Sequence, residues 1–196
     1  VVSVLFCLQV LDIKITLLLA GSAALLVGLG LGIQQIFNDL VSGMFLLFEG
    51  SVQIGDILEI DGMVCRVKEI KLRTSLVETR DSIVKIVPNH KFINDTVTNW
   101  SRQTSNYARF RLIVGVSYKS DPEHVRKVLT DVMERNSDVL DIKDKEPKVR
   151  FSSFGDSSIN FEMVFWSERL FRIENVLSDI RYEVFKRLRE EGIEIP

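Results

Sequence analysis

The sequence contains few of the residues that build covalent cross-links or metal sites. Of its 196 residues, two are cysteines, Cys7 and Cys65, and two are histidines, His90 and His124. Two cysteines exclude a disulfide framework and a cysteine-built metal site, and two histidines leave little material for a histidine cluster. Neither histidine has a cysteine or serine partner at a recognisable spacing. We therefore predict no metal, no cofactor and no catalytic residue.

A charge excess of either sign is also missing. The chain has 25 lysines and arginines against 27 aspartates and glutamates, a formal net charge of -2. Nucleic-acid binders are usually basic, so this balance argues against a nucleic-acid partner. Within residues 101–196, 17 acidic residues are matched by 17 basic residues. The sequence therefore predicts no strong electrostatic field over this part of the chain.

Charge is scarcest at the N-terminal end. Residues 1–48 contain only Asp12, Lys14 and Asp39 as charged side chains, and residues 15–37 contain none. As a helix, this uncharged run would measure roughly 34 Å, enough to cross a ~30 Å hydrocarbon core. It is longer than the ~7–15-residue core of a signal peptide, and no basic segment precedes it. The sequence therefore predicts a transmembrane helix here.

The residues before this helix are also apolar. Residues 1–10 are too few to span a bilayer, and residues 11–14, Leu-Asp-Ile-Lys, place two charges where a turn at the membrane interface would lie. We therefore expect residues 1–14 to be the end of a preceding membrane helix and the turn after it. A second membrane helix would make the protein multi-pass.

The predicted membrane helix carries small residues at every fourth position. This spacing places them along one side of a helix, where neighbouring helices can approach closely. They are Ala20, Ala24, Gly28 and Gly32. Larger side chains also stand four positions apart on other sides, among them Val27 and Leu31. Such a distribution suits the packing of identical helices in a ring, and an ordinary two-helix contact is the alternative interpretation.

The helical pattern continues beyond the uncharged run and becomes amphipathic. Polar side chains share one face, and apolar side chains such as Phe37 and Phe45 share the other. The polar residues are Gln34, Gln35, Asn38, Asp39 and Ser42. A straight helix over 15–48 would measure ~51 Å, well beyond the bilayer core. We therefore expect a bend near 34–38, and a second half at the membrane surface with its apolar face towards lipid or protein. Gly43 is a second flexible position.

Short alternating runs follow this helix. Strands are predicted at 57–60, 64–70, 73–78, 83–88 and 96–99, with a hairpin turn at Asp61-Gly62. Five short strands in about fifty residues favour a small β-barrel of the SH3 or Sm type.

The C-terminal part has a different rhythm. Strands are predicted at 107–116, 148–154 and 159–166, a helix starting at 120–123, a helix at 173–191 and an edge strand at 193–195. The order β-α-β-β-α-β is that of a ferredoxin-like α/β sandwich. The predicted fold class is thus a membrane α-helical segment followed by an α+β part, which consists of a small β-barrel and then this sandwich.

Several short motifs, taken in order, resemble those of a known family. Residues 27–35 are Val-Gly-Leu-Gly-Leu-Gly-Ile-Gln-Gln and residues 40–43 are Leu-Val-Ser-Gly. Downstream stand Leu-Leu-Phe-Glu at 46–49, Gly-Asp at 55–56, Val-Pro-Asn at 87–89 and Thr-Asn-Trp-Ser at 98–101. Together they resemble the small-conductance mechanosensitive channel (MscS) family over nearly the whole chain. The resemblance implies a homo-heptameric, tension-gated channel that releases ions and small osmolytes on hypo-osmotic shock, and no enzymatic activity.

The resemblance also implies a division of the chain. Residues 1–14 would end a preceding membrane helix, and residues 15–48 would form the pore-lining transmembrane helix with a bent, amphipathic second half. Residues 49–100 would form the β domain, and residues 101–196 the ferredoxin-like domain. The protein would lie in the cell (inner) membrane with the residues after about 49 in the cytoplasm. Its partners would be further copies of the chain, membrane lipids and permeating ions and small solutes.

Carried over by position, the resemblance implies three groups of site residues. Val27 and Leu31 match the pore constriction. Small positions where pore helices pack are matched by Ala20, Ala24, Gly28 and Gly32. Gln35 and Asn38 lie where the pore helix breaks, and Gly43 matches a glycine in its second half. The sequence also departs from the family pattern: Val27 replaces a leucine, Gln35 stands where a glycine is often seen, and Gly50-Ser51 stands where the family often has Arg-Pro or a similar pair.

A membrane-anchored binding module is the alternative function, because a Sm-like barrel beside a ferredoxin-like sandwich can bind RNA or a peptide. RNA-binding versions usually expose aromatic residues in a basic groove. Here Phe110, Phe151 and Phe161 alternate within predicted strands, so we predict that they are core residues. An enzyme is disfavoured, since the glycines at 28–32 follow no strand and therefore do not indicate a dinucleotide-binding loop.

Overall fold

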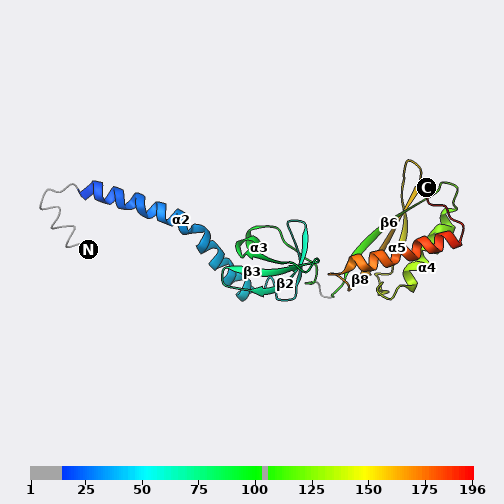
Figure 1. Cartoon of the computed structure of the whole chain (residues 1–196), viewed down its shortest axis with the longest axis horizontal. Coiled ribbons are helices and arrows are strands. Elements are labelled where there is room, and N and C mark those ends of the chain that lie inside the picture. The colour runs from blue at the N-terminus through cyan, green and yellow to red at the C-terminus, as the bar shows by residue number, and fades with distance from the viewer. Residues whose placement is uncertain (1–14, 103–105) are drawn as a thin grey trace. The chain divides into compact units, whose positions relative to one another are not determined.

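The computed structural model describes residues 15–102 and 106–196 (Figure 1). The turn and preceding helix that we predict at 1–14 lie outside the described residues. The chain divides into two compact units. The first contains the long N-terminal helix together with Ile70–Ser75 and Ile86–Asp95, and the second contains Ile54–Glu69, Leu76–Lys85 and Thr96–Pro196.

The first unit is built around α2 (Ile15–Glu49), a helix of 35 residues. Its segment Leu19–Glu49 is long and apolar enough to cross a membrane. The backbone stays helical through residues 34–38, so the predicted bend does not take the form of an interrupted helix. Figure 1 shows that the ribbon of α2 instead changes direction between its first and second halves. The short helix α3 (His90–Asn94) belongs to the same unit.

The β domain contains the five short strands that the sequence predicts. They are β1 (Ile57–Ile60), β2 (Met63–Ile70), β3 (Thr74–Thr79), β4 (Val84–Pro88) and β5 (Thr98–Asn99), in the order β4-β3-β2-β1-β5. Asp61 and Gly62 have φ values of 51° and 73°, so both central residues of the β1–β2 turn are left-handed. This is the turn type that Asp-Gly favours, and it fixes the register in which Ile60 pairs with Met63.

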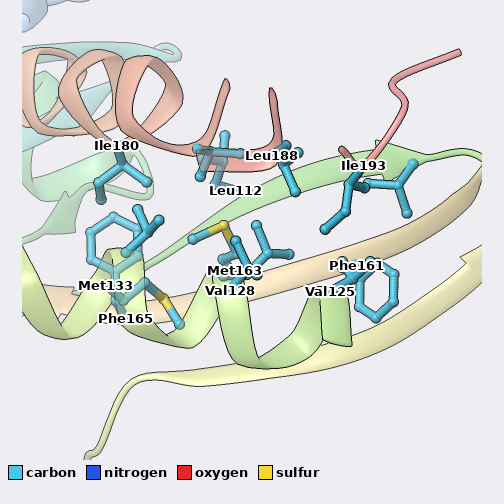
Figure 2. Close-up of a cluster of buried hydrophobic side chains, with 14 of the residues drawn as sticks. Leu112, Val125, Val128, Met133, Phe161, Met163, Phe165, Ile180, Leu188 and Ile193 are labelled. Carbon is cyan, nitrogen blue, oxygen red and sulfur yellow. The ribbon is translucent and has the colours of Figure 1, made fainter. Parts of the chain in front are cut away.

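The C-terminal part is an α/β sandwich with three strands and two helices. Its elements are β6 (Ala108–Val116), α4 (Pro122–Arg135), β7 (Lys148–Phe154), β8 (Ile159–Ser167) and α5 (Ile173–Glu190). The strand order is β6-β8-β7, with both pairings antiparallel. Figure 2 shows the core, in which Met163 and Phe165 of β8 lie among residues such as Met133 of α4 and Ile180 of α5. The helices therefore cover one face of this sheet.

The predicted edge strand at 193–195 does not form. After α5, Gly192 adopts a φ of 66°, its N–H donates to Arg189 O and the Ile193 N–H donates to Leu188 O at 2.8 Å. These two bonds form a Schellman cap, which uses the N–H that would have begun the strand. Glu194 O still accepts a bond of 2.9 Å from Ser117 N at the end of β6. The topology is therefore β-α-β-β-α followed by an extended tail.

The three phenylalanines that we predicted as core residues have different environments. Phe161 is 1% exposed, and Phe110 is partly buried against the same core. Phe151, however, is 43% exposed, so the prediction is wrong for this residue. The reason is that β7 lies at the edge of the sheet, where only β8 flanks it.

Cys65 gives a pH-dependent prediction for the β domain. Its side chain is fully buried in β2, and this burial raises the pKa of the thiol from 9.0 to about 11, although the charge of Lys85 acts in the opposite direction. Because the unfolded chain loses this proton more readily than the folded one, the stabilisation is complete below pH 9 and is lost as the pH rises towards 11. At ~1.4 kcal/mol per pKa unit, the loss is at most about 3 kcal/mol.

A Cys7→Ser background makes Cys65 the single thiol for this test. We expect the denaturation midpoint to fall between pH 9 and 11, and the fall to be smaller in the Cys7→Ser/Cys65→Val variant. If the midpoints of the two proteins depend equally on pH, the Cys65 thiol is not the source of the pH dependence.

Candidate pore helix and coupling site

The first half of α2 presents an apolar surface that no other described part of the chain covers. Val27 is 62% exposed, Leu31 is 68% exposed and Leu25 reaches 73%. An 18-residue stretch of the helix is 0% buried. A contiguous apolar surface of this size marks a protein or membrane contact. The two predicted constriction residues are therefore left uncovered by the described part of the chain.

The glycines of this half are not explained by packing within the chain. Apart from its chain neighbours and the nearby backbone of its own helix, a Cβ atom placed on Gly28, Gly30 or Gly32 would meet no described atom within 4 Å. Each glycine nevertheless costs ~1 kcal/mol of helix stability relative to alanine. No contact within the described part of the chain therefore accounts for this cost. Close helix–helix approach in a membrane is the contact that small residues permit.

The second half of α2 buries a stripe that contains two of the five predicted polar-face residues, and it leaves its apolar face exposed. Asp39, Ser42 and Leu46 are 3%, 2% and 1% exposed, and Gly43 is also buried. Their spacing defines one helical stripe. On the opposite face, Phe48 is 88% exposed, with Phe37, Met44 and Phe45 also exposed. This mixed stripe is therefore the buried side of the helix in the first unit, and the apolar face remains available for lipid or protein.

Gly43 lies where α2 approaches the backbone of the β2–β3 connection. A Cβ atom on Gly43 would come within 2.5 Å of Asn89 Nδ2, and still closer to the carbonyl oxygen of Leu72. Real side chains essentially never make contacts of this length, and a backbone carbonyl cannot swing aside as a flexible side chain can. The contact therefore requires glycine, for a reason different from the flexibility that we predicted.

Asn89 holds that connection in place. It is 0% exposed, and its side-chain amide donates to the carbonyl oxygens of Lys71 at 2.8 Å and Leu72 at 3.1 Å. Its side-chain oxygen accepts from Ser75 Oγ at 2.8 Å, and its backbone N–H donates to Arg73 O. A buried amide with these partners satisfied fixes the 71–75 segment as a firm surface for the helix.

Asp39 and His90 join α2 to α3. Asp39 Oδ1 accepts from the backbone N–H of His90 at 3.3 Å and lies 2.6 Å from His90 Nδ1. The short distance to a carboxylate requires that Nδ1 carries a proton. Gln35 Nε2 is 2.8 Å from the same Nδ1, and two donors cannot bond to each other. The network is satisfied when the Gln35 amide turns its oxygen towards the imidazole, so that Nδ1–H is shared between both acceptors.

The structure thus brings together some of the predicted site residues. Gln35 and Gly43 contact the segments 70–75 and 86–95, whereas Asn38 is half-buried and takes part in none of these bonds. We did not predict Asp39 and His90 as partners of each other, and His90 begins the short helix α3. The signal available in the sequence was the charge of Asp39, which is the only charged residue among residues 15–48.

We expect the Asp39→Ala substitution to loosen the attachment of α3. It removes both hydrogen bonds to His90 and takes away the acceptor of the His90 backbone N–H, at a cost of about 1–3 kcal/mol. Hydrogen exchange of the amides of residues 90–94 should speed up accordingly. Asp39→Asn is the matched control, because it keeps an oxygen acceptor of the same shape, and its effect should be smaller. Unchanged exchange in both variants would contradict a role for Asp39 in this attachment.

Comparison with known proteins identifies the fold. Residues 35–102 match the family model described as the mechanosensitive ion channel β-domain, and residues 110–195 match that of the mechanosensitive ion channel MscS C-terminal domain. An uncharacterised MscS family protein of Archaeoglobus fulgidus is 31% identical over 180 residues, covering 92% of this chain and 62% of the relative. The mechanosensitive channel MscK of Escherichia coli is 38% identical over 142 residues, covering 72% of this chain and 12% of MscK.

A solved structure shows the same fold. The crystal structure of Helicobacter pylori MscS in a closed state superposes with a TM-score of 0.84 at 24% identity, covering 97% of this chain and 74% of that one. An apolar helix followed by a β domain and an α/β domain is thus the membrane-channel fold that these proteins share. The chain belongs to the MscS family, which confirms the resemblance seen in the sequence. It spans 62% or less of the two curated relatives described above.

Proposed function

We propose that the protein is a mechanosensitive ion channel in which several copies of the chain surround one pore. The observation that carries the proposal is the first half of α2, whose apolar side chains are exposed and whose glycines have open space around them. Both features are explained at once if identical helices pack side by side in a membrane. Relatives named as mechanosensitive channels support the same conclusion.

In such a ring, Val27 and Leu31 form the gate. They are one helical turn apart, so their side chains make two stacked apolar collars around the axis. A narrow apolar constriction loses its water and stops ions even where it is not sterically sealed. Ala20, Ala24, Gly28 and Gly32 line the helix contacts, where small side chains let the helices slide and tilt.

Membrane tension opens the gate because it favours whichever state occupies more membrane area. The second half of α2 couples this change to the β domain through Gln35 and Gly43, which contact the segments 70–75 and 86–95. The apolar face around Phe45 and Phe48 lies against lipid or a neighbouring chain. Opening would release ions and small osmolytes on hypo-osmotic shock.

The assembly that we propose is a homo-heptamer in the cell membrane, with each chain multi-pass and the residues after about 49 in the cytoplasm. Electron microscopy of the detergent-solubilised protein tests the heptamer, and a seven-fold particle is expected. Patch recording from cells that lack other mechanosensitive channels tests the channel activity, and tension-dependent currents are expected. A monomeric protein, or membranes that stay silent up to rupture, would overturn the proposal.

Gly28→Leu should impair opening. A leucine at this position widens the contact between adjacent helices, and overpacking of a tight interface costs typically ~1–3 kcal/mol for each copy. The tension needed for half-maximal opening should therefore rise. Leu26→Val, which removes one methylene from an exposed position of the same helix, is the control. If the tension for half-maximal opening is unchanged in Gly28→Leu, Gly28 does not lie at the contact between adjacent helices.

A further inference from the structure

The outer face of the C-terminal sheet, which faces away from α4 and α5, carries an unexpected set of charges. In the antiparallel ladders, Arg111 and Lys148 both stand opposite Val164, while Ile113 and Arg150 both stand opposite Glu162. Residues that are directly opposite in a ladder point to the same face. Because Met163 and Phe165 point into the core, the alternate residues Glu162 and Val164 point outwards with their partners.

This outer face is strongly cationic. Arg109, which stands opposite Trp166, belongs to the same outward row as Arg111, so four cations share the face with one carboxylate. The sequence predicted no strong field here because acidic and basic residues balance in number. That prediction is wrong locally, since the strand period sorts the charges of β6 and β7 onto one face while most acidic residues lie elsewhere.

The arginines of this face are poorly neutralised. The distance from Glu162 Oε1 to Arg111 Nη1 is 3.9 Å, which is long for an ion pair, and the Arg111 side chain is 79% exposed. Among the residues that the structure describes, none forms an ion pair with Arg109 or Arg150. Guanidinium groups present donors in a planar fork that matches a carboxylate or a phosphate. Unpaired forks on one face are therefore available to an anion.

A cavity of about 660 Å³ adjoins these arginines. Arg109, Arg111 and Arg150 line it together with Glu162, and Trp100 and Phe110 supply an apolar wall. Thr98 and Asn99 at the strand β5 add polar groups. The volume suits a small molecule, and the combination of apolar wall and convergent charged groups is typical of small-ligand sites.

We propose that this cavity binds a small anion that carries a carboxylate or phosphate group. The positive charge of the lining arginines favours an anionic ligand, and their planar guanidinium groups match the oxygens of a carboxylate or a phosphate. The side chain of Trp100 offers a contact for an apolar part of the ligand. The arginines are exposed to water, so the affinity is low, with a Kd on the order of 1 mM. Binding of this kind does not require that the protein conducts ions.

Calorimetric titration of the detergent-solubilised full chain tests the site. Inorganic phosphate and L-glutamate, both as sodium salts at constant ionic strength, are the two probes, and they separate phosphate from carboxylate recognition. Saturable binding of at least one probe is expected. Arg111→Gln/Arg150→Gln should weaken it by about tenfold or more, and Lys127→Gln, which removes an exposed cation of α4, should leave it unchanged.

The variant Glu162→Gln provides the sharpest outcome, because it removes the one carboxylate of the cavity lining while keeping the shape of the side chain. We expect it to tighten binding about threefold. Loss of binding in the double arginine variant supports the site only if its melting curve matches that of the wild type. Absence of saturable binding to both probes, an equal loss in Lys127→Gln, or no tightening in Glu162→Gln would each overturn the proposal.

Discussion

A Leu31→Ser channel should conduct at a tension well below the wild-type threshold, and it should leak at rest. In the proposed ring, Leu31 contributes one apolar side chain from every copy to the same constriction. Exposing a leucine side chain to water costs about 1.5–3 kcal/mol, and a serine hydroxyl removes most of this cost at each copy. The effects act on a single water column, so the barrier to hydration falls by the sum over the ring.

Leu29→Ser is the matched control for this substitution. It makes the same chemical change two residues away, which is on a different side of the helix. In this variant the serine would face lipid or a neighbouring helix, so resting conductance should stay low. Patch recording under stepped suction measures both variants in the same membrane background. If the two variants leak equally, or if neither does, Leu31 does not form the constriction.

The secondary structure could be predicted from the sequence wherever the regular spacing of apolar residues extended over enough residues to be recognised. Strand β8 was predicted at 159–166 and is Ile159–Ser167, and the Asp61-Gly62 turn has the positive φ values that this dipeptide favours. Helix α3 was missed because five residues give barely one helical turn and only Phe92 is buried. The tail at 193–195 was assigned wrongly because strand propensity says nothing of a helix cap that uses the Ile193 N–H.

The coupling site was less accessible from the sequence. Periodicity divided residues 34–48 into a polar and an apolar face, but it could not tell that Asp39 and Ser42 are buried while Gln34 and Gln35 stay exposed. Asp39 can be buried because its partner, His90, lies 51 positions away in the chain and meets its carboxylate with two donors. A burial rule based on hydropathy alone favours the opposite orientation. Contacts between distant segments decide such cases, and one sequence contains no direct record of them.

Gly43→Ala should be the most damaging single-methyl substitution in α2. The new Cβ would overlap Leu72 O and lie 2.5 Å from Asn89 Nδ2, and Asn89 itself fixes both groups by its bonds to Lys71 and Leu72. Neither the Leu72 carbonyl nor the Asn89 amide can move without breaking these hydrogen bonds, so the helix must move away from the 71–75 segment. We expect a loss of about 2–4 kcal/mol of stability, within the range of overpacked cores and broken buried networks.

Gly21→Ala makes the same chemical change where, apart from the chain neighbours and the nearby backbone of the same helix, no described atom lies within 4 Å of the new Cβ. Alanine is favoured over glycine in a helix by ~1 kcal/mol, so this control should leave stability unchanged or raise it. Thermal unfolding in detergent measures the contrast between the two variants.

In patch recordings, lifting α2 off the 71–75 segment should also broaden the response to tension, because the pore helix then moves without its attachment to the β domain. A Gly43→Ala protein that melts and gates like the wild type would show that this contact does not hold α2 to the β domain.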